Sequence, residues 1–282
     1  MFPLALILGF AFQSAKLPIS DLPKDIVKMR PANGIAARVD GIEIKVSDVD
    51  ALLWDWRKDD VLDDLIAYRL VKAEATKMGL KATDTEIKEA VNKLFQAISD
   101  TLDKGQDLQS AMLSQGTTLS RVHMRVATEV LMRKIILASF KPQEFIDIST
   151  ITIKPNSDSL ADLKSAIELA DGVYQRLQRG ENFDAVLLSV AKDPNAIKAR
   201  GKVGWRKESA LPEQTRKELN TLKAGQFTKP AQTVNGIQVF RIDQFGRDAK
   251  GENLTALQDW YVGGMRVQVV DKLRKAAKIE RF

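Results

Sequence analysis

Residues 201–245 read GKVGWRKESALPEQTRKELNTLKAGQFTKPAQTVNGIQVFRIDQF. A glycine turn and a tryptophan open this stretch, and the sequence from Glu213 to Leu222 is typical of a short helix. Asn235-Gly236 is a turn signal ahead of an alternating run at Ile237–Ile242. The stretch therefore predicts a short helix between a turn-rich segment and a closing strand.

The residues upstream of this stretch extend the same pattern. Residues 148–153, ISTITI, are β-branched and alternate, which predicts a strand. Residues 160–179 have helical periodicity and stop before Gly180. A second helix is predicted from Asn182 to Val190, and residues 191–200 form a polar loop that leads to Gly201.

The amino-terminal half predicts mainly helices. Residues 35–46 alternate around Asp40-Gly41, a hairpin signal. Ser47 is the predicted cap of a helix beginning at Asp48. Further helical patterns run to Ser139 and include a capping box in TDTE. We expect three apolar residues of the first helix to face a core; they are Leu52, Leu53 and Trp56.

Composition limits the function classes. The 282 residues are 44% hydrophobic and 28% charged, as in a soluble chain with two folded domains. The formal net charge of +6 arises from 43 basic residues interleaved with 37 acidic ones. This mild excess is compatible with proximity to membrane headgroups, whereas the 6% of aromatics show no stacking pattern. We expect no nucleic-acid binding.

The chain has no cysteine and one histidine, His123. Internal disulfides, thiolate catalysis and cysteine-ligated metals are therefore excluded, and no histidine cluster can form. His123 lies on a predicted helix, where a single histidine is usually a surface or core-edge residue, so we assign it no role. We expect neither a metal nor another cofactor.

The amino terminus reads MFPLALILGFAFQSA and is apolar from Phe2 to Phe12. This run is too short to span a hydrocarbon layer of about 30 Å. It is typical of a secretory signal peptide cleaved after Ala15. The missing basic residue before the run, and Gln13 near the cut, leave a buried amino-terminal strand or helix as the alternative. We expect a secreted or periplasmic protein.

The order of motifs in the central part resembles the PpiC-type parvulin peptidyl-prolyl isomerases. The matching pieces, in chain order, are Gly180 with Phe183, Asp193-Pro194, Gly201 with Gly204-Trp205, Leu211-Pro212, Leu222-Lys223 with Gly225-Gln226, Lys229-Pro230 and Asn235-Gly236-Ile237. Each piece alone is common, but their succession is specific. The resemblance implies a small antiparallel sheet wrapped by helices and a rotamase activity.

Rotation of an X-Pro amide faces a barrier of about 18–20 kcal/mol but breaks no bond. An isomerase therefore needs an apolar pocket for the proline ring and polar groups that favour the twisted amide. By the resemblance, Asp193 and Thr233 fall on the acidic and hydroxyl positions of the parvulin polar cluster. Thr150 and Gln238 fall on its two histidine positions. These four residues are the candidate catalytic set.

Three further residues fall on substrate-pocket positions of the same family: Val203, Leu211 and Thr215, the last in place of a phenylalanine. Losing that aromatic wall weakens proline binding, because aromatic side chains bury much apolar area. Thr150 and Gln238 can still hydrogen-bond Asp193 and Thr233, so we expect a neutral polar cluster. The alternative is that Thr150 and Gln238 are ordinary strand residues of a retained fold.

The amino-terminal half resembles the SurA-type chaperone domain in the order RVDGIEI, LDDLIAYRLVKAEATKMGL, ATDTEI and QGTTLSRVHMRVATEVLMRKII. Members of that family hold unfolded exported polypeptides, and a carboxyl-terminal helix completes their helical domain. The expected fold class is therefore α+β. The expected parts are a signal peptide (1–15), a helical chaperone domain (16–142), a parvulin domain (143–246) and a terminal helix that packs back on the helical domain (247–282).

Together these patterns predict an exported folding factor that binds unfolded or proline-containing polypeptides. Its parvulin domain either catalyses isomerisation or only binds peptides, which leaves a non-catalytic holdase as the alternative. A third interpretation is an envelope assembly scaffold that reuses the same fold. The clients and the oligomeric state do not follow from the sequence.

Overall fold

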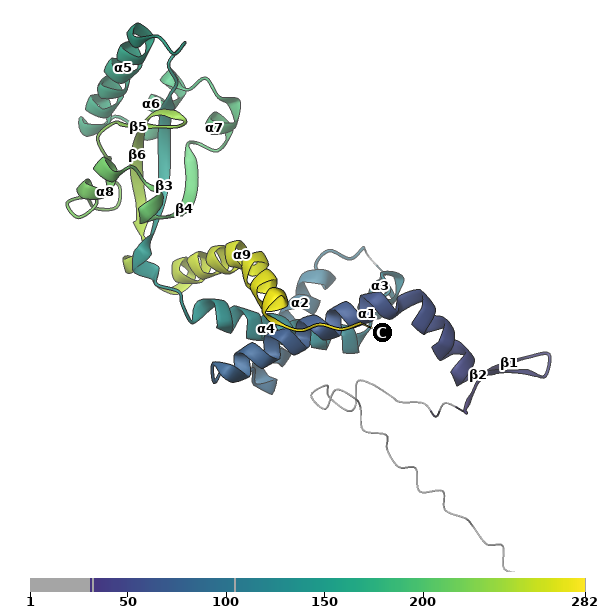
Figure 1. Ribbon diagram of the computed structural model, residues 1–282. Coiled ribbons are helices and arrows are strands. Elements are labelled where there is room, and N and C mark those ends of the chain that lie inside the picture. Colours follow the sequence, from purple (N-terminus) through teal and green to yellow (C-terminus); the bar gives the residue numbers. More distant parts are fainter. Residues whose placement is uncertain (1–30, 32, 104, 282) are drawn as a thin grey trace, which may run out of the picture. The chain divides into compact units, whose positions relative to one another are not determined.

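The computed structural model describes residues 31, 33–103 and 105–281 (Figure 1). The predicted signal peptide, residues 1–15, lies outside the described residues. Contacts divide the chain into one unit made of Met1–Ile136 with Arg266–Phe282, and a second made of Leu137–Met265. The first unit is mainly helical and the second contains a four-stranded antiparallel sheet, which confirms the α+β class.

The first unit begins with the predicted hairpin. Strand β1 (Ile35–Val39) pairs antiparallel with β2 (Ile42–Lys45). Asp40 and Gly41 connect them with φ angles of 49° and 84°. Two successive positive φ angles are what a two-residue turn matching strand twist requires, and Asp-Gly tolerates them. The hairpin prediction is thus confirmed.

Helix α1 (Val46–Lys77) is one continuous helix of 32 residues. It begins two residues before the predicted start, with Lys45 rather than Ser47 at the cap position. The carboxylate of Asp48 accepts the Lys45 backbone N–H at 2.9 Å, and this side chain closes the first turn. The predicted Ser47 cap is therefore wrong, because an aspartate one residue on satisfies the free backbone donor instead.

The prediction that Leu52, Leu53 and Trp56 face a core is also wrong. Their exposed fractions are 49%, 48% and 67%. The helical periodicity there is real, but none of the described elements covers this half of α1. The second half does pack, since Tyr68 is buried with Met124.

Three further helices follow in this unit: α2 (Asp84–Ser99), α3 (Leu108–Ser114) and α4 (Leu119–Leu137). The capping box at α2 is confirmed, because Thr83 and Glu86 each accept the other's backbone N–H. Val91 of α2, Met112 of α3 and Val122 of α4 form a small buried cluster. These elements bury a core that α1 joins only with its second half.

Helix α9 (Gly251–Ala276) belongs to both units, and its second half from Arg266 onwards lies in the first one. There Arg266 pairs with Glu129 of α4, and Arg274 and Arg281 pair with Asp63 of α1. A small groove of about 130 Å³ lies among α1, α4 and this part of α9.

The sheet of the second unit has the strand order β4-β3-β6-β5. Its bounds are β3 (Phe145–Ile153), β4 (Lys202–Lys207), β5 (Ala231–Thr233) and β6 (Gly236–Phe245). Both central strands are longer than their alternating patterns predict. All pairings are antiparallel, and β3, the first of these strands in sequence, lies between β4 and β6.

Helices α5 (Leu160–Gln178) and α6 (Phe183–Val190) cover one face of this sheet (Figure 1). Their side chains form a core with Ile151 and Val239 of the central strands. The opposite face carries Ile148 and Phe240, which pack with Leu211 and other apolar residues from the connection between β4 and β5. The fold therefore presents two apolar layers, one on each side of β3 and β6.

Two short helices lie between these strands. Helix α7 (Pro194–Lys198) occupies the segment predicted as a loop, because Asp193 caps it and proline suits its first turn. Helix α8 (Glu213–Glu218) is shorter than predicted. The 3-10 turns are η1 (Pro142–Glu144), η2 (Glu208–Ala210) and η3 (Gly246–Asp248).

The first half of α9 lies in the sheet-containing unit. Phe140, Phe145, Trp260 and Tyr261 form an aromatic cluster with ring centroids 5.1–5.7 Å apart. This cluster explains why contacts divide the chain at 136/137 and 265/266 rather than at the sequence boundaries 142/143 and 246/247. Among the described helices, none is both long and apolar enough to cross a membrane.

Candidate functional site

The candidate catalytic residues lie on and beside the two central strands. In the β3–β6 register Thr150 lies opposite Phe240, and Thr152 lies opposite Gln238. Side chains two residues apart on a strand share a face, so Thr150 and Gln238 are diagonal neighbours. The structure therefore places the two family histidine positions on adjacent strands and on one face of the sheet.

The hydrogen bonds of these two side chains do not join them. The Thr150 hydroxyl donates to the backbone carbonyl of Val239 at 3.3 Å. The Gln238 amide donates to the Thr152 hydroxyl at 2.9 Å, and Gln238 is only 9% exposed. Each polar group is satisfied by a neighbour on β3 or β6 rather than by the other.

The remaining two candidates, Asp193 and Thr233, form hydrogen bonds with backbone groups close to them in the sequence. Asp193 is exposed and accepts the backbone N–H of Asn195 at 2.9 Å as the cap of α7. The Thr233 hydroxyl donates to the Gly236 carbonyl at 3.0 Å and accepts the Asn235 N–H at 3.0 Å, which stabilises the β5–β6 turn. The described hydrogen bonds do not join the four candidates into the expected cluster. Thr150, Asp193 and Thr233 bond to backbone groups, and Gln238 bonds to the Thr152 hydroxyl.

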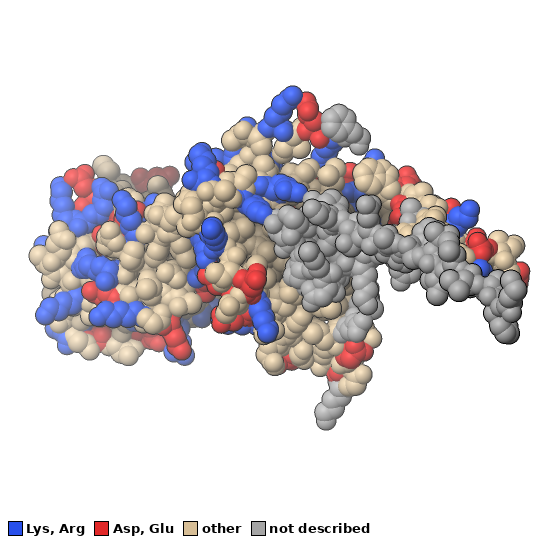
Figure 2. Space-filling view, turned by 90° about the horizontal axis from the view of Figure 1, so that it is seen from below, with Lys and Arg blue, Asp and Glu red and all other residues tan. Residues whose placement is uncertain are grey.

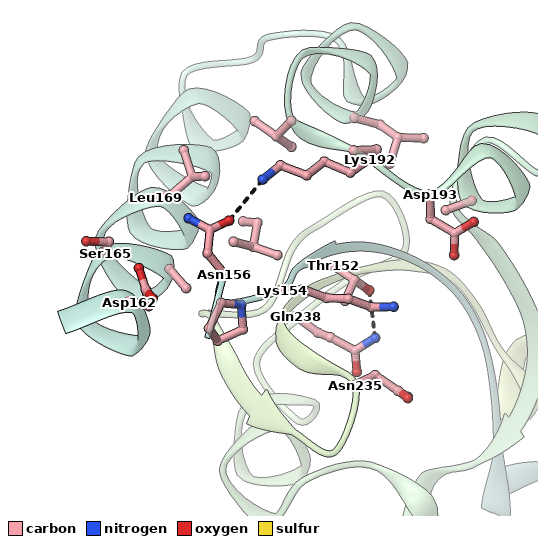
Figure 3. A pocket seen from close by; sticks show the side chains of 17 residues that line it. Thr152, Lys154, Asn156, Asp162, Ser165, Leu169, Lys192, Asp193, Asn235 and Gln238 are labelled. Carbon is pink, nitrogen blue, oxygen red and sulfur yellow. Dashed lines mark hydrogen bonds between the residues drawn. The ribbon is translucent and has the colours of Figure 1, made fainter. Parts of the chain in front are cut away.

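A cavity of about 370 Å³ opens at the end of the sheet that Gln238 occupies. Figure 3 shows Ser165 and Leu169 of α5 on one side and Asp193 on the other, with Thr152 and Gln238 between them. Of the candidates, Gln238 and Asp193 line this cavity and Thr150 and Thr233 do not. The volume lies within the ordinary range for small-ligand and side-chain pockets.

The rim of the cavity is polar. Lys192 donates to the Asn156 side-chain oxygen at 3.2 Å (Figure 3). Lys154 and Asn235 line the same opening. Its walls include apolar residues such as Ile153 and Leu187. An opening with apolar walls and side-chain amides and cations at the rim can hold an extended polypeptide by its side chain and its backbone carbonyls.

The expected substrate-pocket residues lie elsewhere, in the apolar layer on the Phe240 face. Leu211 is 7% exposed and packs there, with Val203 partly buried against the same cluster. Thr215 is 1% exposed and its hydroxyl has no hydrogen-bond partner. None of the three lines the cavity. The structure thus brings Val203 and Leu211 together but as closed core rather than as the wall of an opening.

A charged network lies farther along the same strands. Asp243 accepts hydrogen bonds from Ser149 at 2.6 Å, Lys202 at 2.9 Å and Arg241 at 2.6 Å. Burial raises the pKa of the Asp243 carboxyl, but these three donors outweigh burial, so its net pKa is lowered. Burial likewise lowers the pKa of Lys202, and its bonds to Asp147 and Asp243 more than reverse this.

Elsewhere, charges of both signs are interspersed over the face shown in Figure 2, as the composition predicts. Within the described residues, no group of three or more His, Cys, Asp or Glu side chains is arranged to hold a metal ion. The candidate site is built from neutral amides and hydroxyls beside two lysines, Lys154 and Lys192, and two carboxylates, Asp162 and Asp193.

Sequence reasoning missed Thr152, the direct partner of Gln238. A signal was present, because Thr152 follows Thr150 by two residues in an alternating strand and so shares its face. It also missed the cavity rim formed by Asn156 and Lys192, which approach from separate loops and have no shared sequence motif.

Comparison with known proteins supports two domain families. Residues 151–244 match the PPIC-type PPIASE domain, and residues 48–136 match the SurA-like N-terminal domain. The first match covers β3 to β6 with the cavity, and the second covers α1 to α4.

The curated relatives that the chain resembles include proteins named chaperone SurA and foldase protein PrsA. The chain is 23% identical over 207 residues to the chaperone SurA of Pseudomonas putida, covering 65% of this chain and 48% of that protein. It is 24% identical over 232 residues to the foldase protein PrsA of Caldanaerobacter subterraneus, covering 81% of this chain and 72% of that protein. The chain thus spans about half the length of the SurA relatives it matches.

Among solved structures, the peptidylprolyl isomerase PrsA of Bacillus cereus aligns with 89% of this chain and 95% of its own, at 16% identity and a TM-score of 0.41. The chain therefore contains a region that matches the PPIC-type PPIASE domain, residues 151–244, and one that matches the SurA-like N-terminal domain, residues 48–136.

Proposed function

We propose that the chain is an exported folding factor that binds unfolded polypeptides and whose PpiC-type domain binds proline-containing segments with little isomerase activity. The observation that carries this proposal is the hydrogen bond from Gln238 to Thr152. It engages the amide at one family histidine position, while a threonine at the other position donates to the backbone.

The physical argument concerns the twisted amide. Catalysis requires interactions that are stronger for the twisted X-Pro bond than for the planar one. Hydroxyl and amide groups with internal partners must first give up those bonds, at a cost of about 1 kcal/mol or more each. Leu211 and Thr215 are buried in the core instead of forming an open proline pocket. The cavity can therefore bind a polypeptide, but it binds the twisted X-Pro amide little more strongly than the planar one.

The names of the relatives support the wider role. The relatives named above are called chaperone and foldase. Polypeptide binding, export to the periplasm or beyond, and the part boundaries 16–142, 143–246 and 247–282 are proposals for this chain. The same holds for Thr150, Asp193, Thr233 and Gln238 as the polar set, and for Val203, Leu211 and Thr215 as the pocket set.

A protease-coupled assay on a prolyl tetrapeptide tests the enzymatic part, with suppression of citrate synthase aggregation measured on the same preparation. We expect aggregation to be suppressed and isomerisation to be close to the rate in buffer. The double variant Thr150→His/Gln238→His should raise the isomerisation rate, whereas Thr228→His, which also lies in this unit, should not. If the unchanged protein isomerises the peptide far faster than buffer does, the weak-isomerase proposal is contradicted. If the unchanged protein does not suppress citrate synthase aggregation, the polypeptide-binding proposal is contradicted.

An envelope assembly scaffold that reuses the same fold is the second candidate. Such a scaffold would show neither activity in these two assays.

A further inference from the structure

The segment between β4 and β5, residues 208–222, covers the apolar layer on the Phe240 face of the sheet. It contains η2, the six-residue helix α8 and the turns around them. Leu211 and Leu219 of this segment are 7% and 2% exposed and pack on that layer, with Leu222 partly buried beside them. The apolar attachment of the segment therefore depends on few side chains.

The backbone hydrogen bonds of this segment are local. Four amides outside the helix interior donate to carbonyls three or four residues earlier in the same segment; they are those of Leu211, Arg216, Leu219 and Thr221. The first described backbone bond to a strand comes after the segment ends, from the Gly225 N–H to the Ile242 carbonyl at 2.7 Å. Residues 208–222 can therefore move off the sheet without breaking a described sheet hydrogen bond.

Two polar contacts tie the segment to the residues around it. The Glu218 carboxylate accepts the Lys229 backbone N–H at 3.0 Å. Glu208 Oε1 lies 3.9 Å from a guanidinium nitrogen of Arg247, which is beyond hydrogen-bond distance. Arg247 is also shared with Asp248, at 4.0 Å. Both ties use a side chain of the segment, so they can break while the strands stay paired.

Unpaired buried polar atoms are concentrated in the same segment. Three buried side-chain atoms of the described residues have no hydrogen-bond partner, namely Glu208 Oε1, Thr215 Oγ1 and Asp147 Oδ1, and the first two belong to residues 208–222. Such an atom destabilises the closed state, because it has left water and gained no partner. Opening of the segment returns both atoms to water.

Helix α5, on the other face of the sheet, has the opposite properties. It is 19 residues long and contains none of these unpaired atoms. It buries four side chains in its own layer: Ala166, Ala170, Val173 and Leu177. Burial of one leucine-sized side chain shifts an opening equilibrium by roughly tenfold to a hundredfold. Residues 208–222 should therefore open far more often than α5.

The charge of Glu208 also opposes closure. Among the described ion pairs its one partner is Arg247. Burial raises the pKa of the Glu208 carboxyl, and Arg247 lowers it by less. The ionised carboxylate is therefore less stable in the closed segment than the neutral acid is. The other charges on α8 and on the end of β4 are engaged elsewhere; the pairs are Glu213 with Lys217, Glu218 with the Lys229 N–H, Arg216 with the Ser209 carbonyl, and Lys207 with Glu144.

We infer that residues 208–222 form a lid that opens as a unit while the sheet and α5 stay folded, and that ionised Glu208 favours the open form. Opening exposes the apolar layer in which Val203 and Phe240 lie. The lid thus controls whether this face of the sheet is closed core or accessible surface. The inference does not rest on the proposed function, because opening is measured without any polypeptide ligand.

Thiol labelling tests the lid, because the chain has no cysteine of its own. Thr215→Cys in the lid and Val173→Cys on α5 each replace a residue that is 1% exposed by one of similar size. Ellman's reagent is added to each folded variant, and the rate is divided by that of the same variant unfolded in urea. We expect Thr215→Cys to react at least about tenfold faster, since local opening is more frequent than global unfolding. Equal normalised rates overturn the inference.

The substitution Thr215→Cys removes the unpaired hydroxyl, so its own effect on the lid acts against the expected result. Glu208→Gln, made in the same variant, tests the charge. We expect labelling at pH 7 to slow by about threefold or more, because a neutral amide costs less to bury than a carboxylate. Glu213→Gln is the matched control, since Glu213 is exposed on α8, and it should leave the rate unchanged. Labelling that Glu208→Gln leaves unchanged or accelerates overturns the role of Glu208.

Trypsin digestion of the unchanged protein is a second measurement that does not depend on the variants folding. Proteolytic cleavage requires local opening around the cut bond. Arg216 and Lys217 are the sites on α8, and Lys164 and Arg176 are sites on α5. We expect mass spectrometry to show cuts on α8 well before cuts on α5. Cleavage on α5 as early as on α8 contradicts a lid that opens by itself.

Discussion

Gln238 donates its side-chain amide to the hydroxyl of Thr152 at 2.9 Å, across the central strand pair of the sheet. Both residues line the cavity at the end of the sheet. The bond joins two neutral groups at the position that the parvulin resemblance assigns to a histidine. Neither of these two side chains is charged, whereas Lys154, Lys192, Asp162 and Asp193 line the same cavity.

This pair should be measurable as a coupling energy. Thr152→Val removes the acceptor and leaves the mostly buried Gln238 amide with one fewer partner, which should cost about 1 kcal/mol of unfolding free energy. Gln238→Leu alone should cost a similar amount, because Thr152 then loses its donor. The double variant should cost less than the sum in urea unfolding. Strict additivity would show that the two side chains do not interact in solution.

Thr215 should be more stable as valine. Its hydroxyl is buried without a hydrogen-bond partner, so the folded state carries the desolvation cost with no compensation. Thr215→Val keeps the shape and removes that cost, and we expect a gain of about 1 kcal/mol in unfolding free energy. Thr233→Val is the matched control, since it removes a hydroxyl with two partners and should destabilise the protein. Equal effects of the two substitutions would contradict this explanation.

Asp243 should be the most costly carboxylate to neutralise in the second unit. It accepts hydrogen bonds from Ser149, Lys202 and Arg241. Asp243→Asn should therefore lower the unfolding free energy at pH 7 by about 1–3 kcal/mol. Because the folded-state pKa is lowered, the stabilisation is present above the unfolded-state pKa and is lost as the pH falls below it. The difference between the two proteins should shrink on acidification, and a difference that grows would contradict the assignment.

Glu86 makes a second pH-dependent contribution, in the helical unit. A hydrogen bond from Lys134, followed by the backbone bond at Thr83, lowers the pKa of this carboxyl from 4.5 to about 2. Its stabilisation is present above pH 4.5 and is lost as the pH falls towards 2. Solvent screens this partly exposed pair, so Glu86→Gln should cost only about 1 kcal/mol at pH 7. Unfolding by urea at pH 7 and pH 3 measures it, and Glu89→Gln, on an exposed position of the same helix, is the control.

Local sequence signals were sufficient to predict most of the strands, helices and turns of the second unit. The β-branched alternation of residues 148–153, the helix that ends at Val190 and the Asn235-Gly236 turn each depend on neighbours within a few residues, and each is where the sequence predicts it. The lengths of the strands were underestimated. Their ends are set by pairing between β3 and β6, which a local pattern does not contain.

The polar cluster could not be predicted in the same way. Residue types at positions 150, 193, 233 and 238 allow hydrogen bonds among them. In the fold, however, the first three side chains bond to backbone groups and Gln238 bonds to Thr152. Which partner is closer depends on backbone positions that only the folded chain defines. The prediction that Leu52, Leu53 and Trp56 face a core was wrong for a related reason. An apolar stripe shows which side of a helix could be buried, but it does not show which element covers it.

Gly201, the first residue of the motif-rich stretch, should tolerate no side chain. Its φ is +69°, and a Cβ atom there would lie 2.6 Å from the backbone oxygen of Thr150 and 3.2 Å from the Phe183 ring. Gly180 has a similar φ of +86° but open space around the same position. Gly180→Ala should therefore cost only the conformational penalty of about 1–2 kcal/mol.

Gly201→Ala should cost clearly more, since the clash is with backbone and β3 must shift at Thr150. The Thr150 N–H donates to the Gly201 carbonyl at 2.8 Å, so the shift also strains a sheet hydrogen bond. Urea unfolding of the two alanine variants measures the difference, which we expect to exceed about 1 kcal/mol. Equal destabilisation would mean that only the backbone angle matters at Gly201 and that the contact with β3 relaxes freely.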